Sequence, residues 1–152
     1  MGRRVAPHPS HTRGGAPLSA FIDTNVLVRH LTGDPPDLAA RATAFLTEAD
    51  ELLLVDLIMA ETIYVLESFY KASRPQIADA MRSLVAMDTV VTIDPALLLR
   101  AVEVYEFDRL DFAEAYLVAQ AESTGVGTIA SFDRSIDRIT TITRIEPPQR
   151  PR

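Results

Sequence analysis

Short apolar runs alternate along the chain with longer segments in which apolar residues recur every three or four positions. The short runs predict buried β-strands, and the longer segments predict amphipathic helices. The strands are predicted at Ser19–Ile22, Leu52–Val55, Thr89–Ile93, Gly127–Ala130 and Thr140–Thr143. The helices are predicted at Asn25–Leu31, from Asp34-Pro35 through Leu46, at Leu57–Tyr70, from Ser73 to Met87, from Asp94-Pro95 through Tyr105 and at Phe112–Ser123. This alternation predicts an α/β fold in which a central parallel β-sheet is flanked by helices in three layers.

Residues at the ends of these segments support the predicted boundaries. Ser73 is followed by Pro75 and Gln76, which is the pattern of a capped helix start, and Gly125 stops the helix that begins near Phe112. Residues 1–17 are rich in Pro, Gly, Arg and His and have no hydrophobic period. We expect them to form a disordered N-terminal extension or to reflect a mis-assigned start.

The length and charge of the chain limit its class. A chain of 152 residues with 47% hydrophobic residues is sufficient for one domain with a buried core. It has no cysteine, no apolar run of the length needed to cross a membrane and no signal-peptide pattern, so a cytoplasmic location is expected. The net charge is −6, but residues 21–133 hold 7 Lys+Arg against 19 Asp+Glu, a charge of −12. Such an acidic body argues against broad electrostatic binding of nucleic acid.

Five acidic residues stand at predicted strand ends or on predicted helices: Asp23, Glu61, Asp111, Glu114 and Asp133. Carboxylates that gather without basic partners repel one another, and a divalent cation relieves that repulsion. Hard oxygen ligands favour Mg²⁺ or Mn²⁺ over zinc. Asp23 and Asp133 each follow a short apolar strand, where ligands collect in open α/β sheets, so we expect them to face one pocket. The pattern indicates a metal-ion nuclease.

Each of these acids also has a purely structural interpretation. Asp23 is a suitable N-cap for the helix that follows it, and Asp111 with Glu114 has the spacing of a capping box. Asp133 is placed to cap a short helix. Glu61 is predicted to lie within the inward apolar stripe of its helix, without a cationic side chain one turn away, which favours a functional role. Residue patterns alone leave both interpretations open for Asp23 and for the Asp111–Glu114 pair.

Four segments in this order resemble the PIN-domain family, in particular its VapC-type toxin branch: Phe21–Leu27, Ala60–Leu66, Glu114–Ala119 and Ser131–Asp133. The resemblance implies a PIN domain over residues 18–147, followed by a short C-terminal tail at 148–152. It implies that Asp23, Glu61, Glu114 and Asp133 are the catalytic acids and hold Mg²⁺ or Mn²⁺, with Asn25 and Ser131 in supporting roles. The third acid of the family is usually Asp, so Glu114 departs from the pattern and Asp111 becomes an alternative metal ligand.

The resemblance also implies an activity and partners. The expected protein is the toxin of a type II toxin–antitoxin system, an endoribonuclease in which water activated by the metal attacks an RNA phosphodiester. The expected partners are the RNA substrate, a cognate antitoxin protein and a second copy of the chain. Operator DNA would be contacted only indirectly, through the antitoxin.

Two other functions are compatible with parts of the sequence. A catalytically inactive PIN-like scaffold that binds protein or RNA would explain the Glu114 departure and the acidic body. A phosphatase of the haloacid-dehalogenase type also begins with an Asp after its first strand, but its second Asp would fall at Asn25, which argues against that class.

Overall fold

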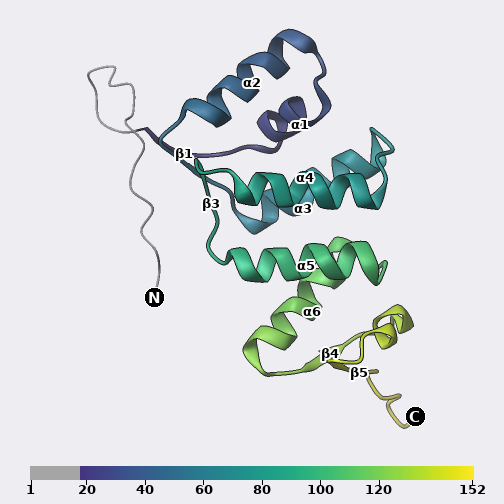
Figure 1. The fold of residues 1–152 in the computed structure, drawn as a ribbon. Coiled ribbons are helices and arrows are strands. Elements are labelled where there is room, and N and C mark those ends of the chain that lie inside the picture. Colours follow the sequence, from purple (N-terminus) through teal and green to yellow (C-terminus); the bar gives the residue numbers. More distant parts are fainter. Residues whose placement is uncertain (1–17) are drawn as a thin grey trace.

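The computed structural model describes residues 18–152, which form six α-helices, five β-strands and one 3₁₀ helix (Figure 1). In chain order these elements are β1 (Ser19–Phe21), α1 (Thr24–Thr32), α2 (Pro36–Glu48), β2 (Glu51–Leu53), α3 (Asp56–Ser68), α4 (Arg74–Ala86), β3 (Val90–Val91), α5 (Pro95–Phe107), α6 (Phe112–Thr124), β4 (Thr128–Ala130), the 3₁₀ helix η1 (Arg134–Arg138) and β5 (Thr143–Ile145). The alternation of strands and helices confirms the predicted α/β class. The predicted N-terminal extension, residues 1–17, lies outside the described residues.

All of the strand pairs within residues 18–152 are parallel, and they form two sheets. The first sheet has the order β1-β2-β3, with Ser19 opposite Glu51 and Leu53 opposite Val91. The second sheet pairs β4 with β5. Parallel pairing requires a long crossover between strands, and helices supply it throughout the first sheet. The carboxyl ends of β1, β2 and β3 therefore lie at one edge of that sheet, and Asp23 follows the first of them.

The strands are shorter than the apolar runs predicted, and one of them is displaced. The last strand was predicted at Thr140–Thr143, but β5 begins only at Thr143. The reason is its register with β4: Thr143 N donates to Gly127 O at 2.8 Å, and Ser131 N donates to Ile145 O at 3.0 Å. The residues just before Thr143 form a turn whose buried member is Ile142.

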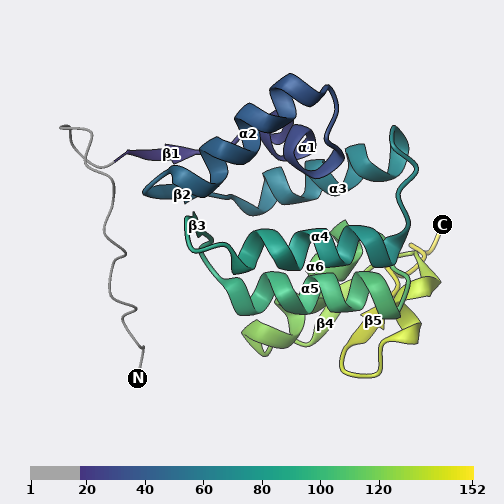
Figure 2. The ribbon, with the colours of Figure 1, turned by 45° about the horizontal axis from the view of Figure 1, so that its top comes forward.

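The helices stack in succession. Both views place α1 and α2 on one side of α3 and α4, and α5 and α6 on the other side, with β4 and β5 beyond them (Figures 1 and 2). The core that runs through this stack contains Leu52 of β2, Met59 of α3, Leu98 and Tyr105 of α5 and Ala115 of α6, all completely or almost completely buried. Burial of these side chains supplies the main stabilising term of the fold.

Arg74 joins α4 to the end of α5 and the loop that leads to α6. Its Nη1 donates to Tyr105 O at 2.8 Å and to Leu110 O at 2.5 Å, and its guanidinium lies 4.5 Å from the centre of the Tyr105 ring. The first bond satisfies a carbonyl group in the last turn of α5, and the second fixes the loop that follows. This loop leads directly to Asp111, one of the five acids predicted as site residues.

The helix boundaries agree with the sequence signals. Ser73 and Gln76 form the predicted capping box at the start of α4, and Gly125 ends α6 in the left-handed conformation with φ of +74°. No helix within residues 18–152 has both the length and the apolar character needed to cross a lipid bilayer.

Candidate functional site

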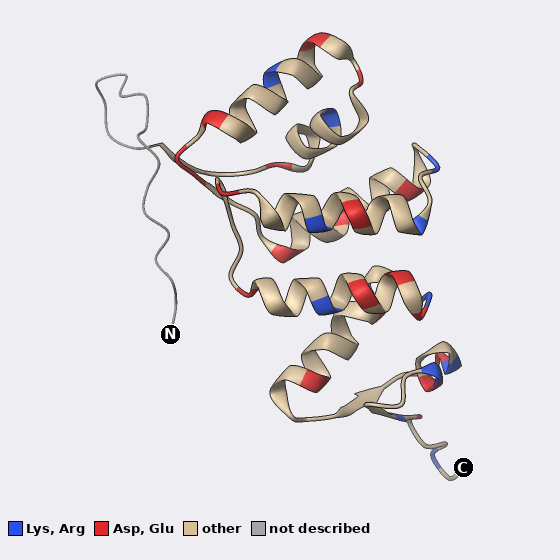
Figure 3. Cartoon of the chain, in the orientation of Figure 1, with Lys and Arg blue, Asp and Glu red and all other residues tan. Residues whose placement is uncertain are grey.

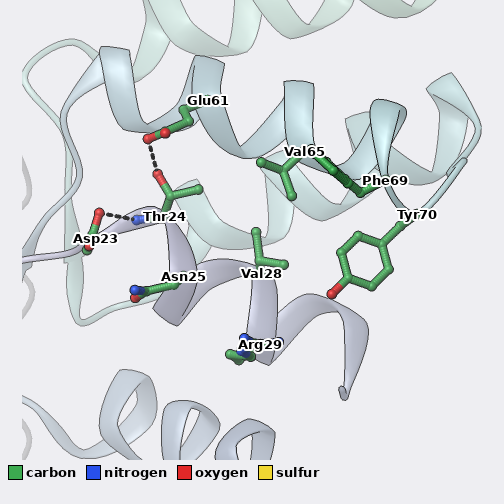
Figure 4. Close-up of a pocket in the computed structure, with 9 residues that line it drawn as sticks. All are labelled: Asp23, Thr24, Asn25, Val28, Arg29, Glu61, Val65, Phe69 and Tyr70. Atoms are coloured by element: carbon green, nitrogen blue, oxygen red, sulfur yellow. Dashed lines mark hydrogen bonds between the residues drawn. The ribbon is translucent and has the colours of Figure 1, made fainter. Parts of the chain in front are cut away.

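Asp23 occupies the junction between β1 and α1. Its backbone is extended and its Oδ1 accepts a hydrogen bond from Thr24 N at 2.8 Å, so it is the N-cap of α1. The side chain remains exposed and lies at a cavity (Figure 4). A capping carboxylate is stabilised by the positive end of the helix dipole, which lowers the cost of keeping an unpaired negative charge there.

Glu61 of α3 is joined to the start of α1 by Thr24. The Thr24 hydroxyl donates to the Glu61 carboxylate, and Thr24 itself is buried, with 8% of its surface exposed (Figure 4). One residue therefore orients both acids: its amide binds Asp23 and its hydroxyl binds Glu61. Sequence reasoning gave Thr24 no role, although a hydroxyl residue directly after a candidate ligand is a signal for such a bridge.

The position of Glu61 differs from the prediction. It was expected on the inward apolar stripe of its helix, but the buried residues of α3 are Met59, Thr62, Ile63 and Leu66, and Glu61 is exposed. Its carboxylate therefore needs no buried cationic partner. Glu67 of the same helix accepts a hydrogen bond from the hydroxyl of the buried Tyr105.

Asp23 and Glu61 line an open cavity of about 440 Å³ between α1 and α3. The remaining lining residues are Thr24, Asn25, Val28, Arg29, Val65, Phe69 and Tyr70. Asn25, a predicted supporting residue, lies beside Asp23 (Figure 4). The cavity thus has an acidic end and an apolar end.

A second acidic group lies where α6 begins. Asp111 is the N-cap of α6 and its Oδ1 accepts from Glu114 N at 2.9 Å. Of the two hydrogen bonds of the predicted capping box, only the one from Glu114 N to the Asp111 side chain is present. The Glu114 carboxyl interacts with Asp133 and Ser135 instead of the Asp111 amide.

Asp133 is fixed by the loop after β4. Its Oδ1 accepts from Ser135 N at 2.8 Å, which makes it the N-cap of η1, and its own N–H donates to Ser131 Oγ at 3.0 Å. Ser131, the other predicted supporting residue, therefore orients the Asp133 backbone. Asp137 is paired with Arg144 at 2.9 Å and is not available to this group.

The pKa values of Glu114 and Asp133 shift in opposite directions. Burial, the hydrogen bond to Asp133 and the charges of Asp111 and Asp133 raise the pKa of Glu114 to about 7. The hydrogen bonds from Glu114 and Ser135 lower the pKa of Asp133 to about 2. Below about pH 7 the pair therefore holds one proton, on Glu114 rather than on Asp133, as expected when like charges approach closely.

The five predicted acids therefore fall into two groups: Asp23 with Glu61, and Asp111 with Glu114 and Asp133. Asp133 is not among the residues that line the cavity of Asp23, contrary to the expectation that the two face one pocket. Neither Asp23 nor Glu61 contributes to the pKa shifts of Glu114 or Asp133. The helices that carry the groups are joined, since the Tyr116 hydroxyl of α6 donates to the Asp56 carboxylate at the start of α3.

The donor chemistry of both groups fits a hard divalent cation. Within residues 18–152 no three His, Cys, Asp or Glu side chains converge as a ready set of metal ligands. Mg²⁺ does not require such a set, because it keeps several waters and is usually held by one or two carboxylates together with substrate phosphate. A pair such as Asp23 and Glu61 supplies ligands of that kind, and so does the crowded pair Glu114 and Asp133.

A sequence model of the PIN domain matches residues 20–142. The match spans both acidic groups and most of the chain, and the protein belongs to the PIN-domain family. Members of this family are generally metal-dependent nucleases. No match to a curated protein was found.

The raised pKa of Glu114 predicts a pH-dependent stability. Its folded pKa of about 7 exceeds the value of 4.5 for a free carboxyl group, so the folded state is destabilised as the pH rises from about 4.5 through 7. Glu114→Gln imitates the protonated form. In EDTA it should match the wild type at pH 5 and be more stable at pH 8, by about 1 kcal/mol after allowance for solvent screening, in urea unfolding.

Glu48→Gln is the matched control, because Glu48 is exposed and has no side-chain hydrogen bond among the described residues. Its unfolding free energy should differ from the wild type by the same small amount at both pH values. A Glu114→Gln variant that gains nothing at pH 8 would show that Glu114 is ionised without cost in the folded protein.

Proposed function

We propose that this protein is a Mg²⁺- or Mn²⁺-dependent endoribonuclease and the toxin of a VapC-type toxin–antitoxin system. The observation that carries the nuclease proposal is the retention of capped, closely spaced carboxylates, in a PIN domain, at the ends of β1 and β4. Carboxylates that lie close together repel one another unless a cation or a proton compensates their charge, and burial together with the neighbouring carboxylates raises the pKa of Glu114.

The residues of the first group would hold a cation at the mouth of the cavity. A bound divalent cation there would neutralise charge that develops on the phosphate oxygens and lower the pKa of water. Thr24 keeps the carboxylates of Asp23 and Glu61 in place through one amide and one hydroxyl bond. Asn25 lies beside Asp23 at the cavity, where its side-chain amide is available to a phosphate oxygen.

The residues of the second group would act on the same phosphate from the side of α6. Ser131 and Ser135 fix Asp133, and Asp133 together with Glu114 provides a second pair of oxygen ligands. The hydrogen bond between Tyr116 and Asp56 holds α6 against the start of α3, the helix that carries Glu61. Asp111 caps α6 through one carboxylate oxygen, and the other oxygen remains available as an alternative ligand.

The toxin role and its partners rest on the resemblance of the acidic segments to VapC-type proteins. A small antitoxin that covers the cavity with a basic side chain would neutralise Asp23 and Glu61 and stop cleavage. We further propose a homodimer, with operator DNA contacted only through the antitoxin.

A catalytically inactive scaffold is the second candidate. The observations that favour it are Glu114 in place of the usual Asp and the separation of the acids into two groups. Cleavage by the purified protein separates the two candidates directly.

The nuclease proposal predicts metal-dependent cleavage of a labelled single-stranded RNA pool that EDTA abolishes. Asp23→Asn should reduce the cleavage rate at least about a hundredfold, because it removes a ligand charge. Asn is also a good N-cap, so α1 should remain intact. Denaturing gels with Mg²⁺, with Mn²⁺ and with EDTA measure the rate.

Asp88→Asn is the matched control, since Asp88 is exposed and has no side-chain hydrogen bond among the described residues. It should cleave at the wild-type rate. Equal cleavage by wild type and Asp23→Asn would identify a contaminating nuclease. Absence of cleavage together with absence of Mn²⁺ binding in calorimetry would favour the scaffold.

The bond from Thr24 to Glu61 predicts that substitutions at Thr24 also change the cleavage rate. Thr24→Val keeps the shape of the side chain but removes the hydroxyl that orients Glu61, so cleavage should fall about tenfold or more. Thr24→Ser retains a hydroxyl and should preserve most of the activity. The rate should recover with higher Mn²⁺ in Thr24→Val if the defect lies in metal binding. Identical rates for the Val and Ser variants would rule out a positioning role.

The toxin role predicts an effect on growing bacteria. Induced expression of the wild-type chain should arrest growth, and expression of Asp23→Asn at the same protein level should not. Colony counts after induction measure the difference. Normal growth in both cases would contradict the toxin role and leave the nuclease proposal standing.

A further inference from the structure

A second cavity adjoins the first. It lies between α1 and α2, has a volume of about 690 Å³ and is lined by Asn25, Val26, Arg29, Leu38, Arg41, Ala42, Ala44 and Phe45. We call it the arginine groove. Asn25 and Arg29 also line the cavity that contains Asp23 and Glu61. The two cavities therefore meet at α1, and a chain that lies in the groove reaches the acids.

The charge of the arginine groove is opposite to that of the body. Its lining contains two arginines and no acid, although residues 21–133 carry a net charge of −12. Figure 3 shows the one basic position on α1, which is Arg29, and the one on α2, which is Arg41. This local reversal is a departure from the rest of the surface, and it favours an anionic ligand.

Arg29 and Arg41 form no ion pair within residues 18–152. Arg82, Arg100 and Arg144 each pair with carboxylates. Arg29 donates one bond, to the backbone carbonyl of Asp34 at 3.0 Å, and Arg41 is exposed and has no hydrogen-bond or ion-pair partner among residues 18–152. Both guanidinium groups retain N–H donors for a ligand.

The floor of the groove is apolar and includes one aromatic ring. Phe45 and Leu38 are each 38% exposed, and Val26, Ala42 and Ala44 also contribute to the lining. An exposed ring next to guanidinium groups is the combination that binds unpaired bases, because a base stacks on the ring while its phosphate contacts the cations. Bases inside a duplex are not accessible to such a ring.

We propose that the arginine groove binds the single-stranded RNA segment next to the bond that is cut, with Arg29 and Arg41 on its phosphates and Phe45 against a base. This inference rests on the proposed nuclease function. An acidic protein segment would also satisfy the arginines. RNA explains the arrangement of both cavities, because a strand bound by the arginines continues past Arg29 to the acids, where a cation would bind its next phosphate.

The test is binding of a fluorescein-labelled 12-nucleotide RNA pool of random sequence, measured by anisotropy in EDTA, in which no cleavage occurs. The double variant Arg29→Gln/Arg41→Gln should bind about tenfold more weakly than the wild type at low salt. The slope of log affinity against log salt should fall by about 1.4, which is about 0.7 for each phosphate of a single strand that an arginine no longer neutralises. Phe45→Leu, which keeps an apolar side chain, should bind about fivefold more weakly.

Two controls separate the groove from general charge and from misfolding. Arg150→Gln removes the same charge from the exposed C-terminal tail, which does not line the groove, and should leave affinity and slope unchanged. Arg29→Lys/Arg41→Lys keeps the charge and should restore the slope. Circular dichroism confirms that each variant is folded.

Equal affinity and slope for the wild type and the Arg29→Gln/Arg41→Gln variant would overturn the inference and leave the groove to an acidic protein segment. Failure of the wild type to bind the pool would overturn it as well. Failure of the nuclease proposal looks different: the wild type would bind RNA through these arginines, yet it would not cut the pool with Mg²⁺ or Mn²⁺.

Discussion

Backbone N–H groups at helix starts hold the acidic residues of this protein. Asp23, Asp111 and Asp133 cap α1, α6 and η1, and each uses its Oδ1 atom for the bond. The second oxygen of Asp23 and of Asp111 is left for another ligand, whereas the Asp133 carboxylate also interacts with Glu114. The capping and functional interpretations of these residues are therefore compatible, because the cap fixes the side chain and the helix end lowers the cost of its charge.

The order and class of the elements were predictable because their signals are local. The capping box at Ser73, the glycine at 125 and the alternation of apolar runs with helical periods each depend on a few adjacent residues. The division of the strands into two sheets was not predictable, because strands of two or three residues contain little pairing information. The exposure of Glu61 was missed because α3 is apolar on several sides: Leu57, Tyr64 and Phe69 are all exposed.

The candidate functional site was likewise predictable only in its local features. Sequence patterns singled out the individual acids, since Asp23, Asp111 and Asp133 stand at strand ends or helix starts and Glu61 and Glu114 lie on predicted helices. Their grouping depends on residues far apart in the chain, such as Thr24 with Glu61 and Glu114 with Asp133. The shift of the Glu114 pKa also follows from that grouping, because it arises from burial and neighbouring charge rather than from the residue type.

The charge distribution relates the acids to the arginine groove. Residues 21–133 carry a net charge of −12 and repel a polyanion, and two of their arginines, Arg82 and Arg100, are neutralised by carboxylates. Under the proposed function, the arginine groove and a cation held by the acids would supply the attraction, and the two cavities meet at Arg29 and Asn25. Under the proposed function, this arrangement would favour RNA segments able to enter the groove unpaired while their next phosphate reaches Asp23 and Glu61.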